Sequence, residues 1–582
     1  MKKNLLFLFL LGSMVSFGQT LLNETFDAGF PPTDWTIDAH SGNWSAGDTN
    51  NAGGSAPEAK LSWNPSFDGT SRLISPVINT EGYTKLLMSF KHLVNDYSGG
   101  YTVGIATTSN GSDWHTVWTL NGMNIQEERL VAIDNEDVGS STFQVCFVFQ
   151  GNSYNLNYWY IDDVELSVPL SVDMGLSGVL NHTFALTGDV NVAASYKNYG
   201  LTTVTEMTMN YSVDGGEAVS ETLSGLSLET ADSAEFTFTT PWVATAGIHE
   251  LKVWISNING QGDDNEMTNN ELTKNISVAS QATNNLALFE EFTSSTCGPC
   301  ATFNNSVFNS FMANNPDVPV IKYQMNWPNP GDPYYTPEGG VRRNYYGVSG
   351  VPNLFVGGKA TATSNDGVNG ALDYENAKNS YFVINATHHI VGDTFSVDVD
   401  ITPYITGEFT LRVAVIEEVT TGNVGSNGET SFKHVMMKML PDASGSLVNF
   451  EDGTNYQQTF SHDMSSTHVE EMDDLRAVVF IQFDESKEVM QSAYSVGETG
   501  STDSEVLNNV DIYPNPSSGV LYLKSDKSLD VYITNMIGQR VFEQNDINAN
   551  ATLDINHLDN GVYLLTIVDG EASTSRKIIL NK

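Results

Sequence analysis

Two of the three cysteines in this 582-residue chain stand together in the motif CGPC, at residues 297–300. A disulfide that closes so short a loop constrains the unfolded chain by only about 2 kcal/mol, which makes it a weak structural staple. At the start of a helix the same pair becomes a redox couple, because the helix dipole favours the thiolate of the first cysteine. The flanking sequence predicts that position. Residues 286–292 read as a buried strand, and apolar side chains recur at helical spacing over residues 303–312.

The sequence beyond the motif extends this arrangement. Residues 318–325 read as the next strand of a βαβ unit, and the run YYGVSGVPNLFVGG follows at residues 345–358. Strand, C-x-x-C, helix, strand and this proline loop together resemble the thioredoxin family. Residues 326–340 interrupt the usual connection to the loop, and two hypotheses are open for them, a lid over the disulfide or a rigid insertion.

The thioredoxin resemblance implies a role for four residues. Cys297 corresponds to the attacking thiol and Cys300 to the resolving thiol, while Pro352 corresponds to the cis-proline that faces the disulfide. Glu291 corresponds to the buried acid that helps to deprotonate the resolving thiol. Gly-Pro between the cysteines is the sequence of reducing thioredoxins, whose reduction potentials are about −270 mV. The resemblance implies no cofactor for this redox module.

The N-terminal residues predict export. A short basic region precedes an apolar core at residues 5–11, which is too short to span a bilayer, and small residues follow it. We interpret residues 1–18 as a signal peptide that carries the chain through the inner membrane. No later stretch is apolar enough to predict a transmembrane segment.

The C-terminal residues predict the final destination. Residues 509–582 contain YPNP at 513–516, the pair GQ at 538–539, NGVY at 560–563 and a terminal basic and apolar run. These blocks resemble the type A sorting domain of the type IX secretion system of Bacteroidetes. The resemblance implies a small β-sandwich, the type IX secretion machinery as a partner, and a mature protein on the cell surface, at the outer membrane or outside the cell.

The charge of the chain narrows the range of partners. Lys and Arg number 26 against 70 Asp and Glu, which gives a formal net charge of −44 at pH 7. Nucleic acid is excluded as a partner, because phosphate binding needs clusters of positive charge. Such an acidic surface favours solubility and attracts divalent cations.

The first mature segment, residues 19–168, reads as short alternating strands and predicts a β jelly roll. It resembles the choice-of-anchor and cleaved-adhesin domains of Bacteroidetes surface proteins. In such jelly rolls the first and last strands can lie side by side, which would bring Glu24 close to Asp163 and could form a structural Ca²⁺ site. The alternative is a solvated acid beside a capped turn. Cys146 lies in an apolar alternating run and is predicted to be an inert core residue.

The remaining segments are mostly β as well. Residues 169–280 resemble immunoglobulin-like modules, residues 281–384 form the predicted thioredoxin-like domain, and residues 385–497 read as a β-sandwich. Together, residues 281–497 resemble a Bacteroidetes outer-membrane-protein family that couples a thioredoxin-like domain to a trailing sandwich. Residues 498–508 read as a linker.

The predicted fold class is therefore a multidomain, mainly β protein with jelly-roll and immunoglobulin-like sandwiches and one α/β thioredoxin-like domain. Two functions fit it. The first is an exported thiol–disulfide oxidoreductase that exchanges disulfides with disulfide-containing or surface proteins. The alternative is a surface adhesion or binding protein in which the thioredoxin-like domain is a non-catalytic scaffold.

Overall fold

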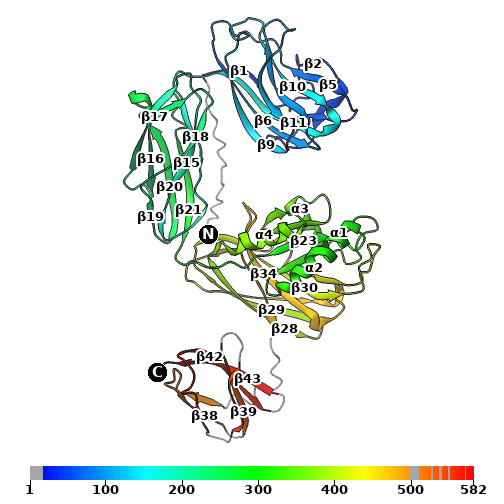
Figure 1. Cartoon of the computed structure of the whole chain (residues 1–582), viewed down its shortest axis with the longest axis vertical. Coiled ribbons are helices and arrows are strands. Elements are labelled where there is room, and N and C mark those ends of the chain that lie inside the picture. Colours follow the sequence, from blue (N-terminus) through cyan, green and yellow to red (C-terminus); the bar gives the residue numbers. More distant parts are fainter. Residues whose placement is uncertain (1–17, 498–509, 526–527, 536–539, 548–550, 570–571) are drawn as a thin grey trace, which may run out of the picture. The chain divides into compact units, whose positions relative to one another are not determined.

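A computed structural model describes residues 18–497, 510–525, 528–535, 540–547, 551–569 and 572–582 (Figure 1). The predicted signal peptide and linker lie outside these residues, apart from residue 18. The chain divides into two compact units, of which the first holds the two N-terminal sandwiches together with Tyr404–Gly407 and the second holds the rest. Within the described part of the chain, no helix is long and apolar enough to cross a membrane.

The first segment of the chain folds into two stacked sheets. The first sheet has the order β3-β4-β11-β6-β9, with β1 paired to β11, and the second has the order β2-β5-β10-β7-β8. The strands are β1 (Gln19–Glu24), β2 (Thr36–Ile37), β3 (Trp44–Gly47), β4 (Glu58–Ser62), β5 (Asp68–Ile74), β6 (Leu86–Asp96), β7 (Tyr101–Thr108), β8 (His115–Asn121), β9 (Ile125–Ile133), β10 (Gln144–Asn152) and β11 (Leu156–Val168).

Alternation along the strands decides which side chains enter the core of this first sandwich. In β10, Val145, Phe147 and Phe149 are fully buried in the main core, while Gln144 and Gln150 point to the other face. A strand with period-2 alternation buries one face only, so two such sheets close a core between them. The predicted neighbourhood of the first and last strands is confirmed, because β1 pairs with β11 and places Glu24 opposite Val164.

The second segment also encloses one core between its sheets. Their orders are β12-β15-β18, β13-β21-β20-β16-β17 and β14-β19. The strands are β12 (Met174–Val179), β13 (Phe184–Leu186), β14 (Gly188–Val190), β15 (Ala193–Asn198), β16 (Val204–Val213), β17 (Val219–Leu228), β18 (Ser233–Thr237), β19 (Trp242–Ala244), β20 (Gly247–Ser256) and β21 (Glu271–Ala279).

The part of the chain that carries the CGPC motif is built on a nine-stranded mixed sheet. Its order is β26-β25-β23-β24-β31-β30-β34-β35, with β32 paired to β30. The strands are β23 (Phe289–Thr293), β24 (Val320–Gln324), β25 (Asn353–Val356), β26 (Lys359–Thr361), β30 (Gly407–Thr420), β31 (Phe432–Leu440), β32 (Ser446–Phe450), β34 (Leu475–Phe483) and β35 (Glu488–Tyr494).

A four-stranded sheet, a two-stranded sheet and the helices complete this region. The four-stranded sheet contains β28 (Phe382–Val391), β29 (Thr394–Pro403), β33 (Tyr456–Asp463) and β36 (Val496–Gly497). The two-stranded sheet contains β22 (Thr283–Asn284) and β27 (Asn379–Ser380). The helices are α1 (Gly298–Phe303), a π-helical turn at Asn304–Phe308, α2 (Asn309–Asn314), α3 (Pro337–Tyr346) and α4 (Asn365–Asn376).

The helical segment after the CGPC motif connects two parallel strands, β23 and β24. β25 then lies antiparallel to β23 on its other side. Phe289 of β23 packs against Phe308 and Phe311 of the helical segment, whereas Phe292 packs on the opposite face against Tyr346 of α3. The predicted βαβ unit and the predicted helix over residues 303–312 are confirmed.

The trailing segment shares the sheet of the CGPC region. Lys322 of β24 pairs in parallel with Val435 of β31, so strands from both sides of residue 385 form one continuous sheet. β30 also pairs with β34 in antiparallel register, from Thr410 opposite Gln482 to Glu417 opposite Leu475. The trailing strands therefore contribute directly to the framework around the cysteines.

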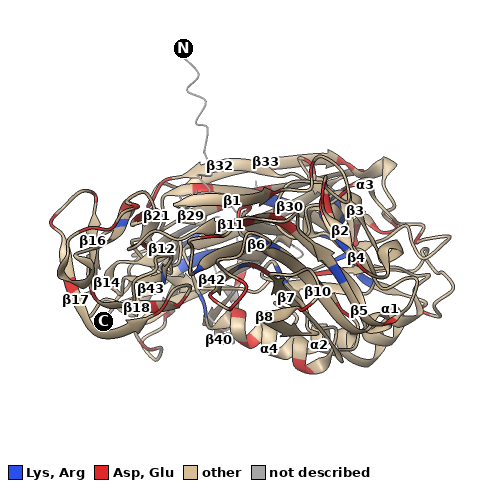
Figure 2. Ribbon diagram, turned by 90° about the horizontal axis from the view of Figure 1, so that it is seen from above, with Lys and Arg blue, Asp and Glu red and all other residues tan. Residues whose placement is uncertain are grey.

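The C-terminal segment forms two small sheets around a core of its own, with orders β37-β38-β41 and β40-β39-β42-β43. The strands are β37 (Asp511–Tyr513), β38 (Val520–Lys524), β39 (Leu529–Asn535), β40 (Arg540–Ile547), β41 (Ala551–Asp554), β42 (Gly561–Asp569) and β43 (Ala572–Leu580). This agrees with the small β-sandwich expected for the tail. Across the whole chain, acidic residues outnumber basic ones (Figure 2).

Candidate functional site

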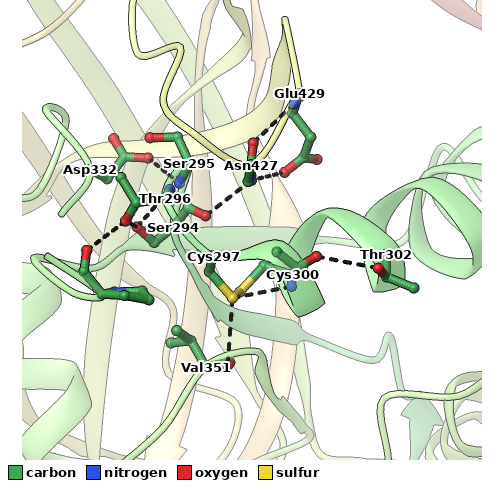
Figure 3. Close-up of a disulfide and its surroundings, with 12 residues drawn as sticks. Ser294, Ser295, Thr296, Cys297, Cys300, Thr302, Asp332, Val351, Asn427 and Glu429 are labelled. Atoms are coloured by element: carbon green, nitrogen blue, oxygen red, sulfur yellow. Dashed lines mark hydrogen bonds between the residues drawn. A yellow bond between two sulfur atoms is a disulfide. The ribbon is translucent and has the colours of Figure 1, made fainter. Parts of the chain in front are cut away.

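The two cysteines of the CGPC motif form a disulfide at the start of the helical segment. Cys297 is the N-cap residue of α1, and its Sγ accepts a hydrogen bond of 3.1 Å from the backbone N–H of Cys300 (Figure 3). Pro299 stands in the first turn, where a missing N–H costs nothing. Cys297 is 2% exposed and Cys300 is fully buried.

The proline loop lies against the disulfide. The peptide bond between Val351 and Pro352 is cis, as predicted from the sequence. The carbonyl oxygen of Val351 lies 3.6 Å from the Sγ of Cys297 (Figure 3). The structure thus brings together Cys297, Cys300 and the Pro352 loop.

Glu291 lies in β23, on the sheet face that packs against the helical segment. Its carboxylate is fully buried, and the Nζ of Lys322 lies 2.9 Å from its Oε2. Burial raises the pKa of Glu291 above its usual value, and the ammonium of Lys322 offsets part of that rise. The Nζ of Lys322 also donates to the Oδ1 of Asn304 over 2.8 Å, which fixes the lysine between strand and helix.

Sequence reasoning did not assign a role to Lys322, although a signal was present. Lys322 is the one charged residue in the apolar run VPVIKYQM of residues 318–325. It stands directly opposite Glu291 in the parallel register of β23 and β24. A buried carboxylate and a buried ammonium on adjacent strands are stable together because each would be costly alone.

A short segment before Cys297 is held by the insertion at residues 326–340. The Oδ2 of Asp332 accepts a hydrogen bond of 2.8 Å from the N–H of Ser295, and the hydroxyl of Thr296 donates to the carbonyl oxygen of Pro328 over 2.7 Å. Asp332 is 5% exposed, and burial raises its pKa. These fixed contacts beside the motif favour the rigid insertion over the lid.

The loop between β30 and β31 holds the same segment from the other side (Figure 3). The backbone N–H of Asn427 donates a hydrogen bond of 2.9 Å to the carbonyl oxygen of Ser295. The side-chain Nδ2 of Asn427 donates a hydrogen bond of 3.2 Å to the carbonyl oxygen of Ser294. A methyl group at Gly425 would lie 2.4 Å from the carbonyl oxygen of Ser295. The trailing strands therefore build one wall of the cysteine site, which sequence reasoning did not predict.

The predicted calcium residues of the first sandwich have protein partners. The Oδ2 of Asp163 forms an ion pair of 2.7 Å with the Nζ of Lys91. The Oε1 of Glu24 accepts a hydrogen bond of 2.8 Å from the backbone N–H of Phe26. Across the described ranges, no group of three or more His, Cys, Asp or Glu side chains could hold a metal ion. Calcium binding at Glu24 and Asp163 stays a prediction.

The neighbouring residue Asp162 is the more deeply buried carboxylate. It is fully buried, and its Oδ2 has no hydrogen-bond partner among the described residues. Burial raises the pKa of Asp162 to about 7, and the nearby carboxylates of Asp163 and Glu58 add to the rise. The sequence offered only the pair of adjacent aspartates as a signal.

The C-terminal segment is the part of the chain with a family match. Residues 511–581 match the family described as the secretion system C-terminal sorting domain. The chain carries a type IX sorting tail. It is a secreted protein bound for the cell surface or the extracellular space, and its tail interacts with the type IX secretion machinery. No curated protein sequence matches the chain.

Solved structures resemble parts of the chain only distantly. TmCBM61, solved in complex with β-1,4-galactotriose, is 15% identical and covers 26% of this chain and 99% of its own, with a TM-score of 0.21. A CARDB domain from Pyrococcus furiosus, solved with di-metal ions, is 15% identical over 19% of this chain and 96% of its own, with a TM-score of 0.16. The exo-chitosanase CsxA of Amycolatopsis orientalis is 11% identical over 88% of this chain and 91% of its own, with a TM-score of 0.25.

Proposed function

We propose that the region around Cys297 is a thioredoxin-like module and that this secreted protein exchanges disulfides with other proteins. The proposal rests on one observation, a C-x-x-C pair at a helix start whose first sulfur lies 3.6 Å from the carbonyl group before a cis-proline. The parallel strands β23 and β24, with the helical segment between them, support the same proposal.

The exchange proceeds in two steps. In the reduced form, the thiolate of Cys297 attacks a disulfide of the partner, forms a mixed disulfide and releases one partner thiolate, which takes up a proton. The thiolate of Cys300 then attacks the sulfur of Cys297 and releases the second partner thiolate. The partner gains two electrons and two protons, and Cys297–Cys300 becomes the disulfide found in the structure. The reverse sequence oxidises a partner dithiol.

The surroundings of the pair supply the chemistry for each step. The N–H of Cys300, which donates to the Sγ of Cys297 over 3.1 Å, stabilises a thiolate there. Glu291 lies on the sheet face that packs against the cysteine helix, and its raised pKa suits it to accept the proton of the Cys300 thiol. Lys322 positions the Glu291 carboxylate from the adjacent strand.

A trapping experiment tests the order of attack. The Cys300→Ser variant of the full mature chain lacks the resolving thiol, so it should accumulate a mixed disulfide between Cys297 and a disulfide-containing peptide. Mass spectrometry of the adduct identifies the sulfur involved. Cys297→Ser is the matched variant and should form no adduct. Trapping at Cys146, or equal trapping by both variants, would refute Cys297 as the attacking thiol.

The burial of the pair favours a second candidate function. Because Cys297 is only 2% exposed, the disulfide could be a local clip in a surface binding protein whose thioredoxin-like region is a scaffold. In that case, oxidised full-length protein mixed with a reduced partner peptide would keep its disulfide, and no mixed disulfide would form with either variant.

A further inference from the structure

The outer face of the second sheet of the first sandwich contains a hollow that the exchange chemistry does not use. Its volume is about 150 Å³, and residues of β5, β7, β8 and β10 line it together with Trp114. We call it the outer-sheet hollow. Its polar and aromatic lining residues are Thr70, Arg72, Thr102, Trp114, Thr116, Thr119 and Gln150.

The strand pattern explains why polar groups gather there. Val103 and Ile105 of β7 point into the main core, so Thr102 and Gly104 point to the outer face. The same alternation in β10 directs Phe149 inward and Gln150 outward. A methyl group at Gly104 would lie 2.3 Å from the carbonyl oxygen of Trp118, so the glycine lets β8 pack closely against β7 beside the outer-sheet hollow.

The polar groups of the outer-sheet hollow are free to meet a ligand. Within the part of the chain that the structure describes, no hydrogen bond engages the hydroxyls of Thr70, Thr102 and Thr119 or the side-chain amide of Gln150. Each hydroxyl is both a donor and an acceptor, and the amide offers two donors and an acceptor. These groups match a ligand that presents many hydroxyl groups.

Trp114 gives the outer-sheet hollow an apolar wall. One part of the ring packs on a small cluster with Cys146, Ile74 and Ala106, which anchors it to the sheet. The guanidinium of Arg72 lies 5.5 Å from the ring centroid and completes the wall. An anchored indole ring can stack on the C–H face of a sugar ring, whose edge hydroxyls then reach the surrounding polar groups.

The charge of the outer-sheet hollow selects against ions. No Asp or Glu residue is among its described lining residues, although the chain carries a net charge of −44. Its single cation, Arg72, is paired with the Oδ2 of Asp38 over 2.6 Å. Divalent cations need carboxylate oxygens and phosphates need unpaired cations, so a neutral polyhydroxylated ligand fits better.

We propose that the outer-sheet hollow binds one or two sugar rings of a neutral polysaccharide. The ring of Trp114 stacks on one sugar face, and Gln150 with the threonine hydroxyls holds the hydroxyl groups at its edge. This site is separate from the cysteine chemistry, and it would place a secreted, tail-sorted protein on glycan surfaces.

Affinity gel electrophoresis of the full mature chain tests the proposal. Native gels contain β-glucan, xylan, galactan or mannan as neutral probes, and polygalacturonate serves as the acidic comparison. At least one neutral polymer should retard the protein. Trp114→Ala should weaken that retardation about tenfold, because an aromatic contact contributes up to roughly 1.5 kcal/mol.

Two further variants keep the result clear if Trp114→Ala fails to fold. Gln150 is exposed, so Gln150→Ala removes a hydrogen-bonding group without disturbing the core and should also weaken retardation. Tyr97 is an aromatic residue outside the outer-sheet hollow with 61% exposure, and Tyr97→Ala should leave retardation unchanged. The proposal is overturned if no neutral polymer retards the protein, if only polygalacturonate does, or if Trp114→Ala and Gln150→Ala are both retarded as the parent is.

Discussion

At the scale of single residues, burial decides which carboxylates can take part in proton transfer. Glu291 is fully buried beside Lys322, and its pKa is raised because desolvation outweighs the attraction of the ammonium. A carboxylate of this kind holds a proton closer to neutral pH than an exposed one, so it can exchange a proton with a thiol.

We expect Glu291→Gln to slow the resolving step at neutral pH by at least about tenfold, since general acid–base groups contribute roughly 10²–10⁴-fold. The rate of the parent should rise through an inflection above the usual carboxyl value of 4.5, and the variant should lack this inflection. Single-turnover disulfide exchange followed across pH measures both effects. Glu485 is exposed, so Glu485→Gln is the control and should retain the parent profile. Coincident profiles for Glu291→Gln and the parent would remove Glu291 from the mechanism.

Asp162 gives a prediction about stability rather than chemistry. Its pKa is raised from 3.8 to about 7 by burial, so the folded state holds the proton more tightly than the unfolded state. The preference of the folded state for protonated Asp162 therefore adds to stability below about pH 4, and this contribution is lost as the pH rises through about 7. Asp162→Asn should therefore raise the unfolding temperature at pH 8 and change it little at pH 4.

Calorimetry of the full chain with a chelator present measures this difference without interference from bound metal ions. The matched variant Asp134→Asn removes a largely exposed ion pair with Lys85, whose contribution is at most about 1 kcal/mol, and Asp134 is not among the charges that raise the pKa of Asp162. An unfolding temperature of Asp162→Asn at pH 8 that equals or falls below that of the parent would show that the buried carboxylate is not a source of instability.

At the scale of elements, the loop between β30 and β31 is the part of the trailing segment that reaches the cysteine site. Gly425 packs against the backbone of Ser295, where a methyl group would lie 2.4 Å from the carbonyl oxygen. Neither backbone can yield without moving its loop. The bonds from Asn427 to Ser294 and Ser295 depend on that close approach.

Gly425→Ala should therefore displace the loop and lower the free energy of unfolding by about 1–3 kcal/mol, the usual cost of overpacking. It should also speed reduction of the Cys297–Cys300 disulfide by dithiothreitol, since one wall of the site moves. Thiol titration over time and calorimetry measure the two effects. Gly370 of α4 has open space around it, so Gly370→Ala should be neutral or slightly stabilising. Parent-like stability and reduction rate in Gly425→Ala would contradict this account of the wall.

The elements that sequence could predict are those with a local signal. The apolar alternation over residues 143–149 predicts a strand and lies almost wholly within β10, and helical spacing over residues 303–312 lies within the helical segment. Cys146 is buried as predicted, but on the outer face under Trp114 rather than in the main core. The alternation of apolar and polar residues predicts which face of a strand enters the main core. It does not predict which residues cover the opposite face.

The features that sequence could not predict depend on contacts between distant residues. The parallel pairing of Lys322 with Val435 joins two segments that each read as a separate domain. The contact of Gly425 with Ser295 follows from that pairing, and a glycine in a loop carries no sign of its partner. The outer-sheet hollow likewise assembles from four strands whose order the alternation does not give.

At the scale of the whole molecule, the sorting tail and the net charge of −44 suit a protein that acts outside the cell. Disulfides persist in such oxidising surroundings, and the oxidised state of Cys297–Cys300 is consistent with them. An exchange module there would act on the disulfides and thiols of other exported proteins. The outer-sheet hollow would add a glycan contact on a separate part of the chain.

The rate of insulin disulfide reduction by the full mature chain, with dithiothreitol as the electron source, tests the central claim most directly. The buried Cys146 thiol, whose pKa burial raises strongly, should not contribute, so Cys146→Ser serves as the matched control. The account predicts that the parent and Cys146→Ser both accelerate the reduction and that Cys297→Ser does not exceed dithiothreitol alone. Equal rates with the parent, Cys297→Ser and dithiothreitol alone would contradict the account and make the disulfide a structural clip.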